Sequence, residues 1–206
     1  MKYGEKLDKK KAYIRSCSFS QIRHILEDYH YKKGAMGGGI SICFAMFIEG
    51  DLVGGSVIGK PRHEKKYPGA IDIRRMACLD IAPRNSESFF LGQIIKYITC
   101  NTKYNFILSY SDKTVGHEGT IYKASNFKCV GETAPTTFVQ WGEKIYHPRS
   151  LSIDRDYSYK MREAIKTGEA ELMTGKPKRI WIYEINKRLR TKVFKVLDIS
   201  NQLELF

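Results

Sequence analysis

The sequence lacks the features that would mark a membrane, secreted or repeat protein. Its longest apolar run, residues 40–48, is too short to span a bilayer, and the charged start of the chain contains no apolar signal core. The five cysteines are widely spaced and form no C-x-x-C pair, which is typical of reduced, mostly buried thiols. No internal repeat or low-complexity segment is visible. These absences predict a soluble cytoplasmic protein without a membrane partner.

Acidic residues are scarce relative to basic ones. The chain has 22 Asp and Glu against 35 Lys and Arg, which gives a net charge of +13. Such an excess indicates a polyanionic partner, of which nucleic acid is the commonest. A basic surface that only aids solubility is the alternative. With 206 residues, 42 % of them apolar, the chain is long enough to bury a core.

The apolar pattern predicts alternating strands and helices. From residue 11 to residue 142 the expected order is β-α-β-β-β-α-β-α-β-β, with a hairpin turn at Glu49-Gly50-Asp51. This order predicts an α/β fold with a mixed central β-sheet flanked by helices. Two neighbouring strands of such a sheet often splay apart and admit a ligand, which is where we expect the site.

The connection between residues 109 and 127 combines reactive side chains with permissive glycines. A strand end delivers Asp112 into this loop, and His117 and Tyr122 follow it. An Asp that such a loop aims into a crevice is a candidate general base. Ordinary turn chemistry accounts for the same residue types, so both interpretations stay open.

Two further motifs carry candidate functional side chains. His30 and Tyr31 lie at a predicted helix end, where they suit acid–base chemistry, metal ligation or base stacking. A histidine that only complements the helix dipole is the alternative. Arg74 and Arg75 are adjacent on a strand and point to opposite faces, so the inward one needs a carboxylate or phosphate partner.

The sequence contains candidate residues for binding a cofactor phosphate and for ligating a metal. Residues 84–88 place an arginine and two serines at a helix N-terminus, which suits an anion, although plain capping by Asn85 or Ser86 explains them equally well. His30, Asp112, His117 and His147 supply the ligand types of a two-His-one-carboxylate iron site. No local spacing supports such a site, so no metal ligands are predicted.

Two late segments interleave cations with aromatic residues. Residues 141–150 and 175–183 have the composition of surfaces that contact a nucleic-acid backbone and stack on bases, although a solvated face is the alternative. We expect a single catalytic domain at residues 11–187. A flexible N-terminus (1–10) precedes it, and a C-terminal extension of unknown role (188–206) follows it.

These motifs together resemble the phage Mom DNA-modification protein family. The resembling stretches are DYHYKKG (28–34), RRMACLDIAPRNSESFFL (74–91), SYSDKTVGHEGTIYKASNF (109–127), HPRS (147–150) and GKPKRIWIY (175–183). The resemblance implies a fold like that of the GNAT acyltransferases. It also implies that the exocyclic amine of adenine in DNA is converted to the carbamoylmethyl form in the host cytoplasm, which protects phage DNA from host restriction.

The resemblance implies an active-site set as well. Carried over onto matching positions, the catalytic residues are Tyr31, Arg75, Ser88, Asp112 and Tyr122. Asp112 would act as the base or as an acceptor that orients the amine, and the tyrosines would stack on a flipped base or donate to a developing anion. Arg75 would bind a carboxylate or phosphate of the donor, with Ser88 assisting at the helix start.

Other positions are expected to bind the substrate or the donor. The substrate-binding set is His30, His117, Asn126, Lys60, Arg62, His147, Arg149, Lys178 and Arg179. The cofactor-binding set is Arg84, Asn85 and Ser86. The glycine-rich pyrophosphate loop of typical acyl-CoA transferases is missing, so the donor is either acyl-CoA-like or another activated small molecule. The expected macromolecular partner is double-stranded DNA, and a homodimer is left open.

Two other functions compete with DNA modification. One is a GNAT-type acyl- or aminoacyl-transferase that acts on a protein or a small amine. The other is a DNA-binding protein without catalytic activity, for which Asp112→Ala would leave the biological effect intact.

Overall fold

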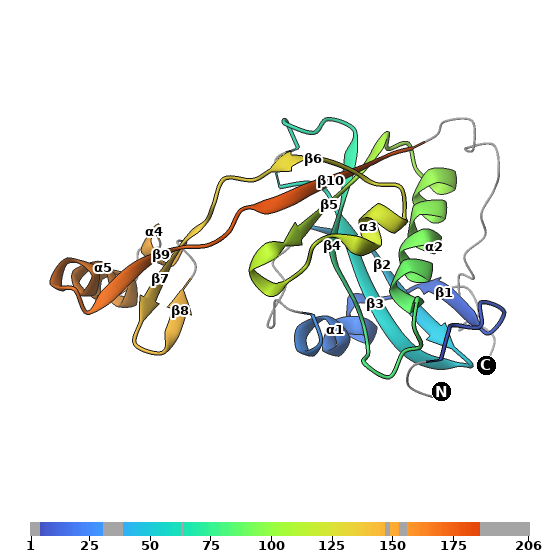
Figure 1. Ribbon diagram of the computed structural model, residues 1–206, viewed down its shortest axis with the longest axis horizontal. Helices are drawn as coiled ribbons and strands as arrows, with labels where there is room; N and C mark the ends of the chain where they lie inside the picture. Colours follow the sequence, from blue (N-terminus) through green and yellow to red (C-terminus); the bar gives the residue numbers. More distant parts are fainter. Residues whose placement is uncertain (1–4, 31–38, 63, 147–148, 153–155, 186–206) are drawn as a thin grey trace. The chain divides into compact units, whose positions relative to one another are not determined.

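The computed structural model describes residues 5–30, 39–62, 64–146, 149–152 and 156–185 (Figure 1). The helices are α1 (Phe19–Asp28), α2 (Ser86–Asn101), α3 (Thr120–Ala124), α4 (Arg149–Ser152) and α5 (Asp156–Thr167), with a 3-10 turn at Lys113–Val115. The strands are β1 (Ala12–Ser16), β2 (Ile40–Ile48), β3 (Asp51–Gly59), β4 (Ala70–Cys78), β5 (Phe106–Asp112), β6 (Lys128–Glu132), β7 (Thr137–Trp141), β8 (Lys144–Tyr146), β9 (Ala170–Thr174) and β10 (Lys178–Glu184). The predicted element order is confirmed.

The strands form two sheets. A seven-stranded mixed sheet has the order β1-β2-β3-β4-β5-β10-β6, and a three-stranded sheet has the order β8-β7-β9. The contacts divide the chain into two compact units. Unit 1 holds the described residues up to Ser109, Gly119–Cys129 and those from Trp181 on, and unit 2 holds Tyr110–Glu118 and Val130–Ile180. The single catalytic domain expected at 11–187 stays a prediction.

Alternation along β2 builds the core of unit 1. Phe44 and Met46 pack with the buried side chains of α2, whereas Cys43 and Ala45 pack with those of α1. Successive side chains of a strand point to opposite faces, so the two helices cover opposite faces of the sheet. The β2–β3 hairpin turns at Glu49 and Gly50 with φ of 54° and 95°, the two positive values of a type I′ turn.

Unit 2 has a smaller core of its own. Helix α5 packs Met161 and Ala164 against Val139 of β7 and Ala170 of β9. Within the part of the chain that the structure describes, no helix is long and apolar enough to cross a membrane.

The apolar pattern of the sequence predicts Tyr29 on the inward face of the first helix and core strands at residues 127–133 and 136–142, and the structure differs at each. Tyr29 was expected on the inward face of the first helix, but it is the C-cap of α1 and is 51 % exposed. Strand β6 was expected in the core, but all five of its residues are exposed because it lies at the edge of the seven-stranded sheet. Strand β7 belongs to the small sheet, where only Val139 is fully buried.

Candidate active site

Strands β4 and β5 part at one end, as the sequence predicts. Their parallel pairing joins Ala70, Ile71 and Asp72 to Phe106, Ile107 and Leu108. Beyond Asp72, β4 continues to Cys78 while the pairing with β5 has ended. The sheet therefore opens toward the carboxyl ends of these two strands, where ligands bind in many α/β proteins.

Tyr122 is held by a hydroxyl and two aromatic rings of unit 1. The buried Ser109 hydroxyl, on β5, donates a hydrogen bond of 2.8 Å to Tyr122 Oη. The Tyr122 ring packs 5.4 Å from the Phe127 ring and 5.8 Å from the Trp181 indole, centroid to centroid. Gly119, with φ of 78°, begins α3 at a place where a Cβ would overlap the Trp181 indole. These contacts hold the side chain of Tyr122, one of the two predicted catalytic tyrosines, in one orientation. Its hydrogen-bond partner Ser109 was not predicted from the sequence.

The loop between β4 and α2 borders an open cavity of about 340 Å³. Its lining includes the predicted residues Arg84, Asn85, Ser86 and Ser88, together with Ile121 of α3. Asn85 caps α2 in a left-handed conformation without a side-chain cap bond. The Ser86 hydroxyl donates to the Pro83 carbonyl at 2.7 Å, and the Ser88 hydroxyl donates to the Asn85 carbonyl at 3.0 Å.

This cavity has mixed charge. Arg84 supplies a cation, whereas Asp80 and Glu87 also line the wall. The N-terminus of α2 favours an anion at the same place. The mixed charge of the cavity suits a polar part of the group-transfer substrate. The hydroxyls of Ser86 and Ser88 donate to backbone carbonyls of the protein.

The two adjacent arginines of β4 contact backbone carbonyls. Arg75 Nη1 donates to the Leu26 carbonyl at 3.1 Å, in the last turn of α1, where a cation is favourable. Arg74 Nη1 donates to the Gly39 carbonyl at 2.9 Å. His30 lies just beyond α1 and is buried. Arg75 therefore ties β4 to the end of α1, the element that precedes His30.

Asp112 of unit 2 is held as a carboxylate. It is 8 % exposed, accepts a 3.0 Å hydrogen bond from the Thr114 amide and forms an ion pair with Lys178. Burial alone would raise its pKa, but the hydrogen bond and charge of Lys178 and the Thr114 amide together lower it below the ordinary value. A lowered pKa makes Asp112 a weak proton acceptor and a good hydrogen-bond acceptor.

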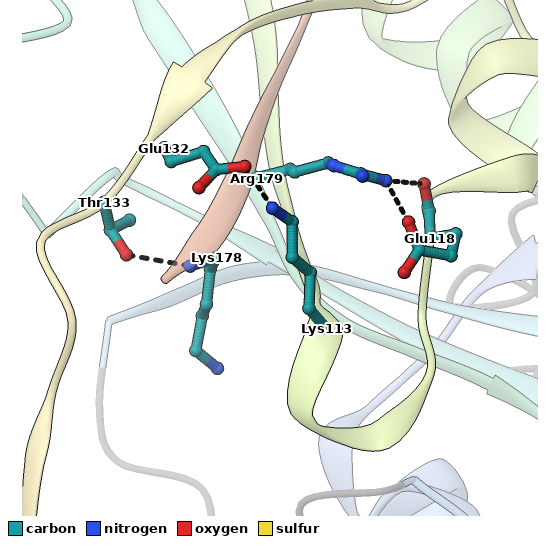
Figure 2. A network of polar contacts seen from close by, with 6 residues as sticks. All are labelled: Lys113, Glu118, Glu132, Thr133, Lys178 and Arg179. Atoms are coloured by element: carbon teal, nitrogen blue, oxygen red, sulfur yellow. Dashed lines mark hydrogen bonds and ion pairs between the residues drawn. The ribbon is translucent and has the colours of Figure 1, made fainter. Parts of the chain in front are cut away.

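Charged pairs continue around Lys178 in unit 2 (Figure 2). Arg179 contacts both the carboxylate and the backbone carbonyl of Glu118, and Lys113 pairs with Glu132. The Lys178 amide donates to the Thr133 hydroxyl at 3.1 Å. Two of the cations expected to contact substrate, Lys178 and Arg179, thus have acidic partners within the protein.

The remaining predicted residues occupy exposed turns or lie outside the described residues. Lys60 pairs with Glu64 at 3.3 Å, and Arg62, His117 and Asn126 are exposed. Tyr31, His147 and the side chain of Arg149 lie outside the described part of the chain. Among the residues that the structure describes, no group of three or more His, Cys, Asp or Glu side chains could hold a metal ion.

Comparisons with known proteins match this architecture. A model of the Mom protein family matches residues 11–201. The methylcarbamoylase mom of Escherichia phage Mu is 25 % identical over 212 residues, which cover 91 % of this chain and 83 % of that protein.

Solved acetyltransferases share the fold at low sequence identity. A Bacillus subtilis acetyltransferase in complex with CoA has a TM-score of 0.55 at 12 % identity, covering 85 % of this chain and all of that one. A GNAT-family acetyltransferase from Streptococcus pneumoniae has a TM-score of 0.52 at 11 % identity, covering 85 % of this chain and 99 % of its own. The predicted GNAT-like fold is confirmed.

Proposed function

The chain belongs to the Mom protein family, and on this premise we propose that it is a phage DNA-modification enzyme. It acts as a transferase on the exocyclic amine of adenine in DNA, and the carbamoylmethyl form is its product. The observation that carries this function is the family match over residues 11–201. The similarity to a phage methylcarbamoylase and the net charge of +13, which suits a DNA partner, support it.

We assign to Tyr122 the role of stabilising the negative charge that develops in the reaction. The Ser109 hydroxyl donates to Tyr122 Oη, which orients the tyrosine as a donor of its own proton. Within unit 2, Asp112 is kept ionised by Lys178 and therefore suits acceptance of a hydrogen bond from an amine. We place the activated donor in the cavity beside Arg84 and the start of α2.

The test is the nucleoside composition of DNA from bacteria that express the protein. Digestion and mass spectrometry should reveal a heavier deoxyadenosine whose added mass identifies the transferred group. Tyr122→Phe and Asp112→Ala should each lower its yield by about 100- to 1000-fold, the range of single positioned donors and acceptors. Tyr159→Phe, at a 55 % exposed position, is the matched control and should behave as wild type.

Unchanged nucleosides with soluble, folded wild-type protein would contradict DNA modification and favour a transferase of proteins or small amines. A silent DNA-binding protein would bind DNA in a salt-dependent manner and also leave the nucleosides unchanged. If Tyr122→Phe and Asp112→Ala both gave the full yield of modified deoxyadenosine, DNA modification would stand but the roles assigned to these two residues would be wrong.

A further inference from the structure

Asp72 lies in unit 1, where β4 and β5 separate. It is the last β4 residue paired with β5, opposite Leu108, and on its other side it pairs with Gly59 of β3. Its side chain is 6 % exposed. A carboxyl group therefore stands at the vertex of the opening between the two strands, in the middle of a sheet.

One oxygen of the Asp72 carboxyl lacks a hydrogen bond within the part of the chain that the structure describes. Its Oδ1 atom is buried and has no hydrogen-bond partner among the described residues. Buried polar atoms in native proteins are nearly always hydrogen-bonded, and an exception needs an explanation. An acceptor that awaits a donor from a ligand is one such explanation, because the ligand then supplies the missing hydrogen bond.

Among the described residues, two cations act electrostatically on Asp72. Arg74 on β4 and Arg62 on the loop after β3 act on it electrostatically, and the directly paired residues of β3 and β5 are Gly59 and Leu108. Asp72 makes no ion pair within the described part of the chain. The two arginines therefore favour the charged form from a distance without occupying its oxygens.

The balance of these effects suits proton transfer near neutral pH. Burial raises the pKa of Asp72 to about 7, against the opposing charges of Arg74 and Arg62. A general base works best when its pKa lies near the working pH. Asp112 has its pKa lowered instead, so Asp72 has the higher proton affinity of the two.

We propose that Asp72, at the vertex between β4 and β5, is the proton acceptor for the exocyclic amine of adenine, an inference that rests on the proposed function. The amine nitrogen attacks the methylene carbon of an activated carbamoylmethyl donor, so a nitrogen–carbon bond forms. The bond from that carbon to the leaving group breaks, and its electron pair departs with the leaving group. One proton of the amine passes to the Asp72 carboxylate, which later releases it to solvent.

The test compares Asp72→Asn, Asp72→Glu and the exposed control Asp51→Asn, which makes the same change of charge on β3. The nucleosides of cellular DNA and the thermal midpoint at pH 8 are measured for each. Asp72→Asn should lower the yield of modified deoxyadenosine at least about 100-fold, because a positioned base contributes 10²- to 10⁴-fold. Its midpoint should rise, since the neutral amide removes the burial of a charge. Asp72→Glu should retain part of the yield, and Asp51→Asn should match wild type.

The outcomes separate a base from a structural carboxylate. A yield from Asp72→Asn within about threefold of wild type would overturn the inference and leave DNA modification standing. Loss of yield together with a lowered midpoint would also overturn it, because Asp72 would then be needed for folding. An absence of modified nucleosides from wild-type protein would remove the proposed function and this inference together.

Discussion

The two units each bury one aspartate of interest, and they treat it in opposite ways. Asp112 in unit 2 is paired with Lys178 and accepts from the Thr114 amide, which lowers its pKa. Asp72 in unit 1 has a buried oxygen without a partner among the described residues, and burial raises the pKa of Asp72 to about 7. One carboxyl group is thus fixed in the charged state, whereas the other is poised between its two states.

The two surroundings suit a carboxylate to different kinds of chemistry. A group that must hold and orient an amine benefits from permanent charge, whereas a group that must take a proton benefits from a pKa near neutrality. Environments that push the pKa values of two acids apart are a recurrent basis for such a division of roles. The contrast concerns local surroundings, because both residues are aspartates with the same ordinary pKa.

The largest expected effect is on the pH dependence of stability. The pKa of Asp72 is about 7 in the folded state against an ordinary value of 3.8, so the folded protein binds the extra proton between these values. The free energy of unfolding therefore falls as the pH rises from about 4 to about 7. At about 1.4 kcal/mol for each pKa unit, the fall is up to about 4 kcal/mol.

Urea denaturation at a series of pH values measures this effect. Asp72→Asn should flatten the curve between pH 4 and pH 7 and leave the acid limb unchanged. That acid limb includes Asp112, whose lowered pKa gives stability that is present above its ordinary pKa and lost as the pH falls through its folded value. If the free energy of unfolding changed equally with pH in wild type and in Asp72→Asn, the pKa of Asp72 would not be raised and the difference from Asp112 would be lost.

A smaller effect is expected when the Asp112–Lys178 pair is broken. The two side chains are 11 % and 21 % exposed, so Asp112→Ala leaves a mostly buried ammonium group without its partner. We expect a loss of about 2 kcal/mol, below the 3–5 kcal/mol of fully buried pairs because some solvent reaches Lys178. Lys178→Met in the Asp112→Ala background should restore part of it, as chemical denaturation would show. Strict additivity of the two changes would mean that the pair is not coupled.

Sequence patterns predicted the parts of this structure that depend on local chemistry. Alternation and turn residues predicted the hairpin at Glu49–Gly50 and the element order, and the loop after β5 was recognised as a candidate site. The Asp112–Lys178 pair joins residues 66 positions apart, which no local pattern indicates. In the sequence, Asp72 resembles any polar residue of a half-exposed strand. Only its burial in the assembled sheet sets it apart from such residues.

The smallest expected effect comes from a second ion pair of unit 2. Lys113 pairs with Glu132 as Lys178 pairs with Asp112, but the Glu132 side chain is 39 % exposed (Figure 2). Solvent screens this pair, so Glu132→Ala, the same change as at Asp112, should cost at most about 0.5 kcal/mol, and added salt should reduce the difference further. The same measurement on both pairs isolates burial, since each joins a lysine to a carboxylate. A loss at Glu132 as large as that at Asp112 would show that burial does not set the strength of these pairs.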